Sequence, residues 1–242
     1  MLILAIVFIA TLIRSAFGFG EALVAVPLLA FCMPLTVAAP LAVLLSVTVA
    51  AVVVVQDWRH IQLRSAAGLV AATVFGIPLG LLVLVNPHQE MVKAGLGILI
   101  MLFAAYSLLV RDAFRLEHEH RPVLLLSGFL AGVLGGAYGM NGPPLVVYGS
   151  LRRWSPQQFR ATLQAYFLPA SVLGMIGYWS TGLWTRTVTR EFLLSLPVML
   201  PAVLLGRAIN HRFSGQAFLK YVYGGLVLIG GMLLVEAVTH RV

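Results

Sequence analysis

Two glycine-rich segments interrupt long apolar stretches, and they carry polar groups that could bind a ligand. The second of them reads Gly139-Met140-Asn141-Gly142-Pro143-Pro144. Glycine releases the backbone from helical geometry, and proline just after such a break suits the first turn of a new helix. Free N–H groups at helix N-termini bind anions without a full charge, and Asn141 adds a side-chain donor. The segment therefore predicts an anion site, with a tight turn between packed helices as the alternative.

Glu21 is the acid that lies deepest in an apolar stretch, directly after the first glycine-rich segment, Phe17-Gly18-Phe19-Gly20. A charged carboxylate within a membrane costs about 2.5 kcal/mol or more, so we expect Glu21 to be neutral, paired or functional. Arg14 lies seven residues earlier and could pair with it across the turn. A role in proton coupling and a structural ion pair are equally good interpretations.

Arg160 and Gln164 lie one helical turn apart at the start of the apolar span that follows the second glycine-rich segment. A guanidinium matches a sulfonate through bidentate donation. We nevertheless favour an interfacial anchor as the interpretation of Arg160, because Arg152 and Arg153 lie close by in the same loop. Gln164 lies deeper, where an anchor has less reason to be, and it is a candidate ligand.

Few residues could support catalysis or hold a metal. The run Glu117-His118-Glu119-His120 lies in a polar linker without a cysteine partner, and we favour a solvated loop over a ligand set. The H-E-x-x-H and G-x-S-x-G motifs do not occur, and no apolar span contains paired acids. We therefore predict that the protein is not an enzyme and has no metal or cofactor. A membrane enzyme or an assembly factor is the alternative from another functional class.

The composition is that of a polytopic helical membrane protein. Of 242 residues, 60% are hydrophobic and only 10% are charged, against roughly 25% charged in ordinary soluble domains. The net charge of +8 raises the question of nucleic acid. The basic residues lie between apolar spans, however, where membrane orientation explains them better. We expect a multi-pass protein of the cell membrane, of the bacterial inner-membrane type, with the lipid bilayer and no nucleic acid as partner.

Six apolar segments have the length of single transmembrane spans: 36–55, 66–85, 94–110, 161–179, 192–209 and 221–238. Two further stretches, 2–33 and 123–151, are too long for one straight pass and too short for two full ones. Both contain a glycine-rich break. We predict that each folds as two short helices that meet at an irregular tip inside the membrane, where protein or a water-filled cavity must cover the backbone.

The two broken stretches belong to an internal repeat. An offset of 121 residues places 15–20 on 136–141 and Trp58 on Trp179, and Gly80 matches Gly206 at an offset of 126. We predict a first repeat over 1–111, a polar linker over 112–122 and a second repeat over 123–242. Each repeat is a broken helical hairpin followed by three transmembrane helices.

The distribution of charge predicts that the repeats are inverted. If each broken stretch makes an even number of crossings, eleven Lys and Arg lie on one side and four on the other, namely Lys93, Arg186, Arg190 and Arg241. Such a bias is expected of the cytoplasmic side. The predicted fold is thus an all-α polytopic membrane protein with two inverted repeats. Secondary transporters have this architecture, with the substrate near the midplane where the breaks meet.

Segments 15–28 and 128–144, which contain the two breaks, resemble the glycine motifs of the sulfite exporter TauE/SafE family. The duplicated layout extends the resemblance over the whole chain. It implies a transporter of small anions, typically sulfur oxyanions or organosulfonates. Glu21 is a departure, since many members continue with glycine there, and an acid at this tip disfavours simple anion binding.

We therefore predict a secondary transporter of sulfite, thiosulfate or organosulfonates that works by alternating access, with proton coupling through Glu21 as a further hypothesis. A carrier of another small anion, such as a carboxylate, is the alternative. The predicted substrate-binding residues are Gly18, Phe19, Gly20, Glu21, Tyr138, Gly139, Met140, Asn141, Gly142, Arg160 and Gln164.

Overall fold

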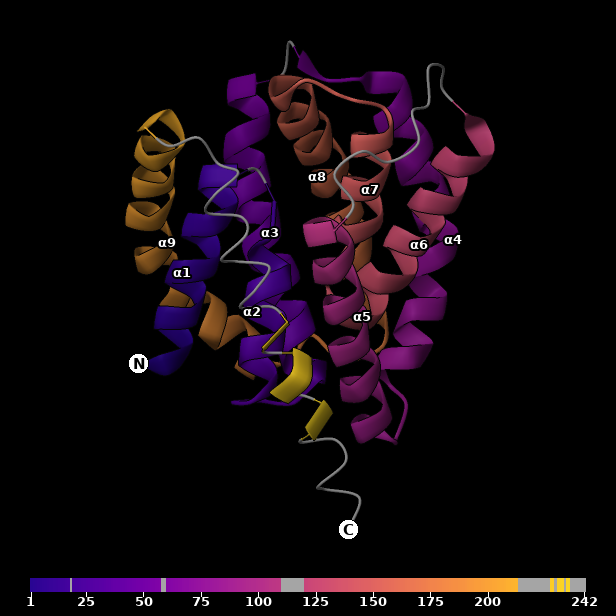
Figure 1. Ribbon diagram of the computed structural model, residues 1–242. Helices are drawn as coiled ribbons and strands as arrows, with labels where there is room; N and C mark the ends of the chain where they lie inside the picture. Colours follow the sequence, from indigo (N-terminus) through magenta and orange to yellow (C-terminus); the bar gives the residue numbers. More distant parts are fainter. Residues whose placement is uncertain are drawn as a thin grey trace.

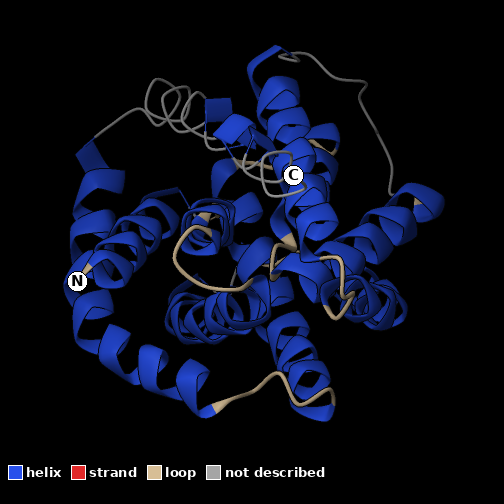
Figure 2. Ribbon diagram, turned by 90° about the horizontal axis from the view of Figure 1, so that it is seen from below, coloured by secondary structure: helices blue, strands red, loops and turns tan. Residues whose placement is uncertain are grey.

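The computed structural model describes residues 1–17, 19–57, 60–109, 120–212, 227–228, 230–232 and 234–235. Within these residues the regular structure is helical, with no strand (Figure 2). The helices lie side by side as a bundle (Figure 1). Their bounds are α1 Leu2–Phe17, α2 Glu21–Ala30, α3 Leu35–Asp57, α4 Leu63–Leu84, α5 Gln89–Leu109, α6 Arg121–Tyr138, α7 Gly142–Leu151, α8 Pro156–Ser180 and α9 Arg186–Arg212.

The predicted single spans that fall in the described residues each form one long helix, namely α3, α4, α5, α8 and α9. The sixth, 221–238, lies mostly outside the described residues. By length and composition, three of the described segments are able to cross a membrane: Leu63–Leu84, Arg121–Tyr138 and Arg186–Gly206. Their outer faces expose large apolar side chains such as Phe75, Leu126 and Leu204, which a bilayer would cover. These features fit an integral membrane protein.

Both long apolar stretches are broken at the predicted tips. α1 ends at Phe17 and α2 begins at Glu21, whereas α6 ends at Tyr138 and α7 begins at Gly142. Gly20 has a φ of 100° and Gly139 a φ of 66°. Side chains of L-residues disfavour these angles, so glycine makes both breaks possible. The prediction of two helices in each stretch is confirmed, although the first helix of each pair has 16 or 18 residues and the second only 10.

Helices α4 and α6 pack closely through glycines on both sides. A Cβ atom added at Gly132 would lie 2.5 Å from the carbonyl oxygen of Thr73, and one at Gly128 would lie 2.5 Å from that of Leu69. On α4, a Cβ at Gly80 would overlap the carbonyl oxygen of Val133. Small residues let membrane helices approach to backbone contact, where dispersion forces hold them together. This interface fixes the first helix of the second hairpin.

Helices α1 and α9 make a related contact. A Cβ at Gly206 would lie 2.7 Å from the carbonyl oxygen of Leu12. The offsets of the repeat match Gly206 to Gly80 and Leu12 to Val133, and Gly80 packs against the Val133 carbonyl. The same close contact therefore occurs twice. Helix α4 packs on α6, and α9 packs on α1.

Helices α3 and α8, which the predicted repeat matches to each other, pack against each other in an antiparallel arrangement. The Ser171 hydroxyl lies 3.5 Å from that of Ser46, and a Cβ at Gly174 would lie 3.8 Å from Val43. Figure 1 shows α1 and α2 toward the end of the bundle that holds the N-terminus, and α6 and α7 toward the other end. The two tips approach each other beside α3 and α8.

Candidate functional site

The two tips enclose a small buried cavity of about 20 Å³, which is room for about one water molecule. Residues predicted as ligands that line it are Phe19, Gly20, Glu21, Gly139, Met140, Asn141 and Gly142. The others that line it are Arg14, Ala22, Leu23, Ser46 and Phe167. Both glycine-rich segments, which are far apart in sequence, thus line one cavity.

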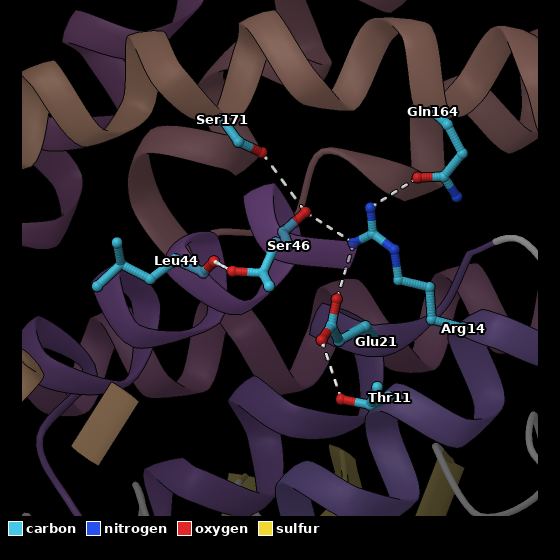
Figure 3. Close-up of polar contacts among 8 residues, drawn as sticks. Thr11, Arg14, Glu21, Leu44, Ser46, Gln164 and Ser171 are labelled. Atoms are coloured by element: carbon cyan, nitrogen blue, oxygen red, sulfur yellow. Dashed lines mark hydrogen bonds and ion pairs between the residues drawn. The ribbon is translucent and has the colours of Figure 1, made fainter. Parts of the chain in front are cut away.

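Arg14 donates hydrogen bonds to three neighbouring side chains (Figure 3). Its Nη1 donates to Glu21 Oε2 at 2.8 Å and to Ser46 Oγ at 2.7 Å, and its Nη2 donates to Gln164 Oε1 at 2.8 Å. Glu21 Oε1 accepts a hydrogen bond of 3.3 Å from Thr11. Arg14 is 4% exposed and Glu21 1% exposed. One guanidinium therefore joins α1, α2, α3 and α8.

The pairing of Arg14 with Glu21, one of the two interpretations of the acid, is observed in the structure. Each ion alone would be strongly disfavoured at this depth, and the pair offsets the two charges. The guanidinium also lies over the ring of Phe167, 5.0 Å from its centroid, in a cation–π contact that is stronger when water is excluded. Phe167 and Gln164 bring α8 of the second half into contact with a charge of the first.

Asn141 is held by a second chain of hydrogen bonds. Its Nδ2 donates to the Tyr166 hydroxyl at 3.4 Å, which lies 2.6 Å from the hydroxyl of Thr73. Thr73 in turn donates to the carbonyl oxygen of Gly128 at 2.8 Å. A Cβ at Gly135 would lie 2.6 Å from Asn141 Nδ2, so only glycine leaves room for this side chain. The amide is thus fixed at the cavity wall by α4, α6 and α8.

The backbone donors of the site are provided chiefly by α2. The first turn of a helix has N–H groups without a partner inside the helix, and in α2 these include Ala22 and Leu23 at the cavity wall. In α7, Pro143 and Pro144 occupy the first turn and have no N–H. We predicted helix N-terminal donors at the start of α7, whereas the first turn of α2 has more N–H groups to offer.

Four predicted residues lie outside the cavity lining or outside the described residues. Gly18 is not among the described residues. Tyr138 is buried and donates to the carbonyl oxygen of Val92 at 3.1 Å, which joins α6 to α5. Gln164 reaches the site through Arg14. Arg160 is half-buried and does not line the cavity.

Sequence reasoning missed Ser46 and Phe167 and treated Arg14 only as a partner of Glu21. Ser46 and Phe167 are ordinary members of apolar spans, and no local pattern distinguishes them. Arg14 did have a signal, because a permanent cation four residues before a break in an apolar helix is rare. Their common role follows only from the packing of α3 and α8 against the first tip.

A buried cavity with a fixed charge, at the meeting point of two interrupted helix pairs in a bundle with an apolar exterior, is the architecture of a membrane transporter. The chain belongs to the sulfite exporter TauE/SafE family, whose model matches residues 3–234. It is 27% identical over 184 residues to the "Probable sulfite/organosulfonate exporter TauE" of Cupriavidus necator. The aligned region covers 76% of this chain and 70% of that protein. No solved structure matches the chain significantly.

Family membership confirms the resemblance seen in the two glycine motifs. The protein is an integral membrane protein of an exporter-type transporter family. This class is consistent with the prediction that the protein is not an enzyme.

Proposed function

We propose that the protein is a secondary transporter that moves small sulfur-containing anions, of the sulfite, thiosulfate or organosulfonate class, across the membrane by alternating access. The observation that carries this proposal is the position of Arg14, a cation that lines a buried cavity between two helix breaks. Arginine presents planar paired donors that match anions with two or more oxygens. The name of the Cupriavidus necator relative gives sulfite and organosulfonates as its substrates.

Alternating access is supported by the arrangement of the two halves, which we propose to be inverted repeats. Helices α3 and α8 run antiparallel, because Ser46 contacts Ser171 and the earlier Val43 contacts the later Gly174. The glycine contacts of α4 with α6 and of α9 with α1 are equivalent. Inverted halves can exchange conformations, which opens one central site to either side in turn. The cavity of about 20 Å³ is too small for a sulfonate, so we assign this structure to a closed state of the cycle.

Proton coupling is proposed to reside in Glu21. An ionised Glu21 repels an anion that enters the cavity, and burial away from water strengthens this repulsion. A proton on Glu21 removes the repulsion and leaves the charge of Arg14 for the anion. Proton and anion would then bind together and move in the same direction.

Binding of the substrate class is the first test. Sulfite, thiosulfate and methanesulfonate should each raise the melting temperature of the detergent-purified protein, because a ligand at 100 times its Kd stabilises a folded state by about 2.7 kcal/mol. Acetate is the comparison ligand. Stabilisation by acetate alone would favour the carboxylate carrier, which the Arg14–Glu21 contact makes the best second candidate. No shift with any of the four anions would contradict anion transport.

The role of Glu21 is tested by the pH dependence of binding. Protonation neutralises Glu21, so the affinity of the parent for methanesulfonate should rise as the pH falls. Glu21→Gln should bind with an affinity that does not change with pH, measured by titration on both sides of neutrality. Glu191→Gln, at a carboxylate of α9 outside the cavity, is the matched control. If Glu21 were only a structural partner of Arg14, its loss would lower stability at every pH by about 3–5 kcal/mol.

A further inference from the structure

The guanidinium of Arg14 has more N–H groups than its neighbours satisfy. A guanidinium carries five N–H donors, and the hydrogen bonds of Arg14 are to Glu21, Ser46 and Gln164. Its Nε is buried and has no hydrogen-bond partner within the described part of the chain. Buried N–H groups are nearly always paired in stable proteins. An unpaired donor on a cation that lines a cavity indicates a place for another acceptor.

Glu21 holds this cation by a single contact. One carboxylate oxygen accepts from Nη1, and the other is directed to Thr11. Nε and Nη2 share the other edge of the planar group, where Nη2 has only the neutral amide oxygen of Gln164 as acceptor. An arginine commonly binds an oxyanion through two parallel N–H···O bonds. In the described part of the chain, no carboxylate therefore accepts a hydrogen bond from the Nε–Nη2 edge of Arg14.

We propose that Arg14 binds the anionic head of the substrate, and that Glu21 is an internal ligand that occupies this cation while the cavity is closed. The inference rests on the proposed transport function and adds the binding residue and its competitor. A sulfonate or sulfite presents three oxygens, two of which match the Nε–Nη2 edge and replace the amide of Gln164. Ala22 and Leu23, in the first turn of α2, line the same cavity.

An internal ligand explains why an acid lies in an anion site. Without substrate, Arg14 would be an unpaired charge at 4% exposure, and Glu21 offsets it. Arg14 is on α1 and Glu21 is on α2, on opposite sides of the break at Gly20. A change of backbone angle at this break would move the carboxylate without moving the guanidinium, which Ser46 and Gln164 hold from other helices. The site can therefore exchange one anion for another around a fixed cation.

Equilibrium binding of methanesulfonate and sulfite to the purified full chain tests the inference. Arg14→Gln combined with Glu21→Gln removes both charges together and should lose binding by about 100-fold or more, since charge-assisted bonds are replaced by neutral ones. Thr11→Val keeps every charge and the size of the side chain, but it removes the hydrogen bond that Thr11 donates to Glu21. It should bind severalfold more tightly than the parent, because the competitor is weaker. Arg190→Gln, at an exposed arginine of α9, should bind as the parent does.

Each result decides between the inference and the function on which it rests. If the double variant melts near the parent and keeps the parent's affinity, Arg14 is not the anion ligand. If the double variant does not fold, Thr11→Val decides, and an affinity equal to or weaker than the parent's overturns the role of Glu21 as competitor. If neither the parent nor Arg190→Gln binds either anion, the transport proposal and the inference fall together. Binding by the parent with loss only in the double variant supports both.

Discussion

Gly142→Leu is expected to abolish transport and to leave the protein folded and inserted. Among the residues that the structure describes, a Cβ atom at Gly142 meets no other atom within 4 Å. The φ of this residue is not in the left-handed region that disfavours side chains. The backbone therefore accepts a side chain. Gly142 lines the cavity of about 20 Å³, so the isobutyl group of leucine adds bulk at the cavity wall and should obstruct the entry of an anion. Anion uptake into proteoliposomes should fall to the level of empty vesicles.

Gly231→Leu is the matched control for this variant. A Cβ at Gly231 also meets no atom of the described residues within 4 Å, and Gly231 does not line the cavity. It should transport at the parent's rate and show the same elution profile in detergent. Normal transport by Gly142→Leu would place the substrate path elsewhere in the bundle. An aggregated Gly142→Leu would show instead that the open space at this residue is required for packing.

Gly80→Ala, which adds one methyl group to α4, is expected to destabilise the protein. The added Cβ would overlap the carbonyl oxygen of Val133 and lie 2.7 Å from the amide nitrogen of Ala137. Both are backbone atoms of α6, which cannot turn away as a side chain could, so the helices must separate. Overpacking of this kind costs about 1–3 kcal/mol or more. The melting temperature in detergent should fall by several degrees.

Gly174→Ala is the matched control on α8. Its Cβ would lie 3.8 Å from Val43, an ordinary van der Waals distance. Alanine is better than glycine within a helix by about 1 kcal/mol, so this variant should melt at or above the temperature of the parent. A Gly80→Ala protein as stable as Gly174→Ala would contradict the close packing of α4 on α6.

The two predicted repeats differ in their chemistry. The offset of 121 matches Arg14 to Gly135 and Glu21 to Gly142, so the ion pair belongs to the first half alone. In the second half, the glycine at position 135 leaves room for the side chain of Asn141. The first half thus contributes both charges to the proposed site, together with Thr11 and Ser46. The second half contributes only neutral polar groups, namely Asn141 and Gln164.

The sequence by itself determined the class of protein, the breaks and the family. Apolar composition and span length depend on the bilayer as solvent, and the breaks depend on glycine and proline, whose backbone properties are local. These features need no knowledge of packing. For the same reason the breaks at Gly20 and Gly139 were predicted at the residues where the structure has them.

Only the tertiary structure decided what Arg14 contacts and which glycines join helices. Arg14 and Gln164 are 150 residues apart, and Gly80 meets α6 through backbone atoms of Val133 and Ala137. Such contacts form only when helices pack together, because a single helix can neither pair a buried charge nor bring its glycines against another backbone. Periodicity along the chain records which residues are apolar, and it contains no information on which helix lies opposite a given side chain.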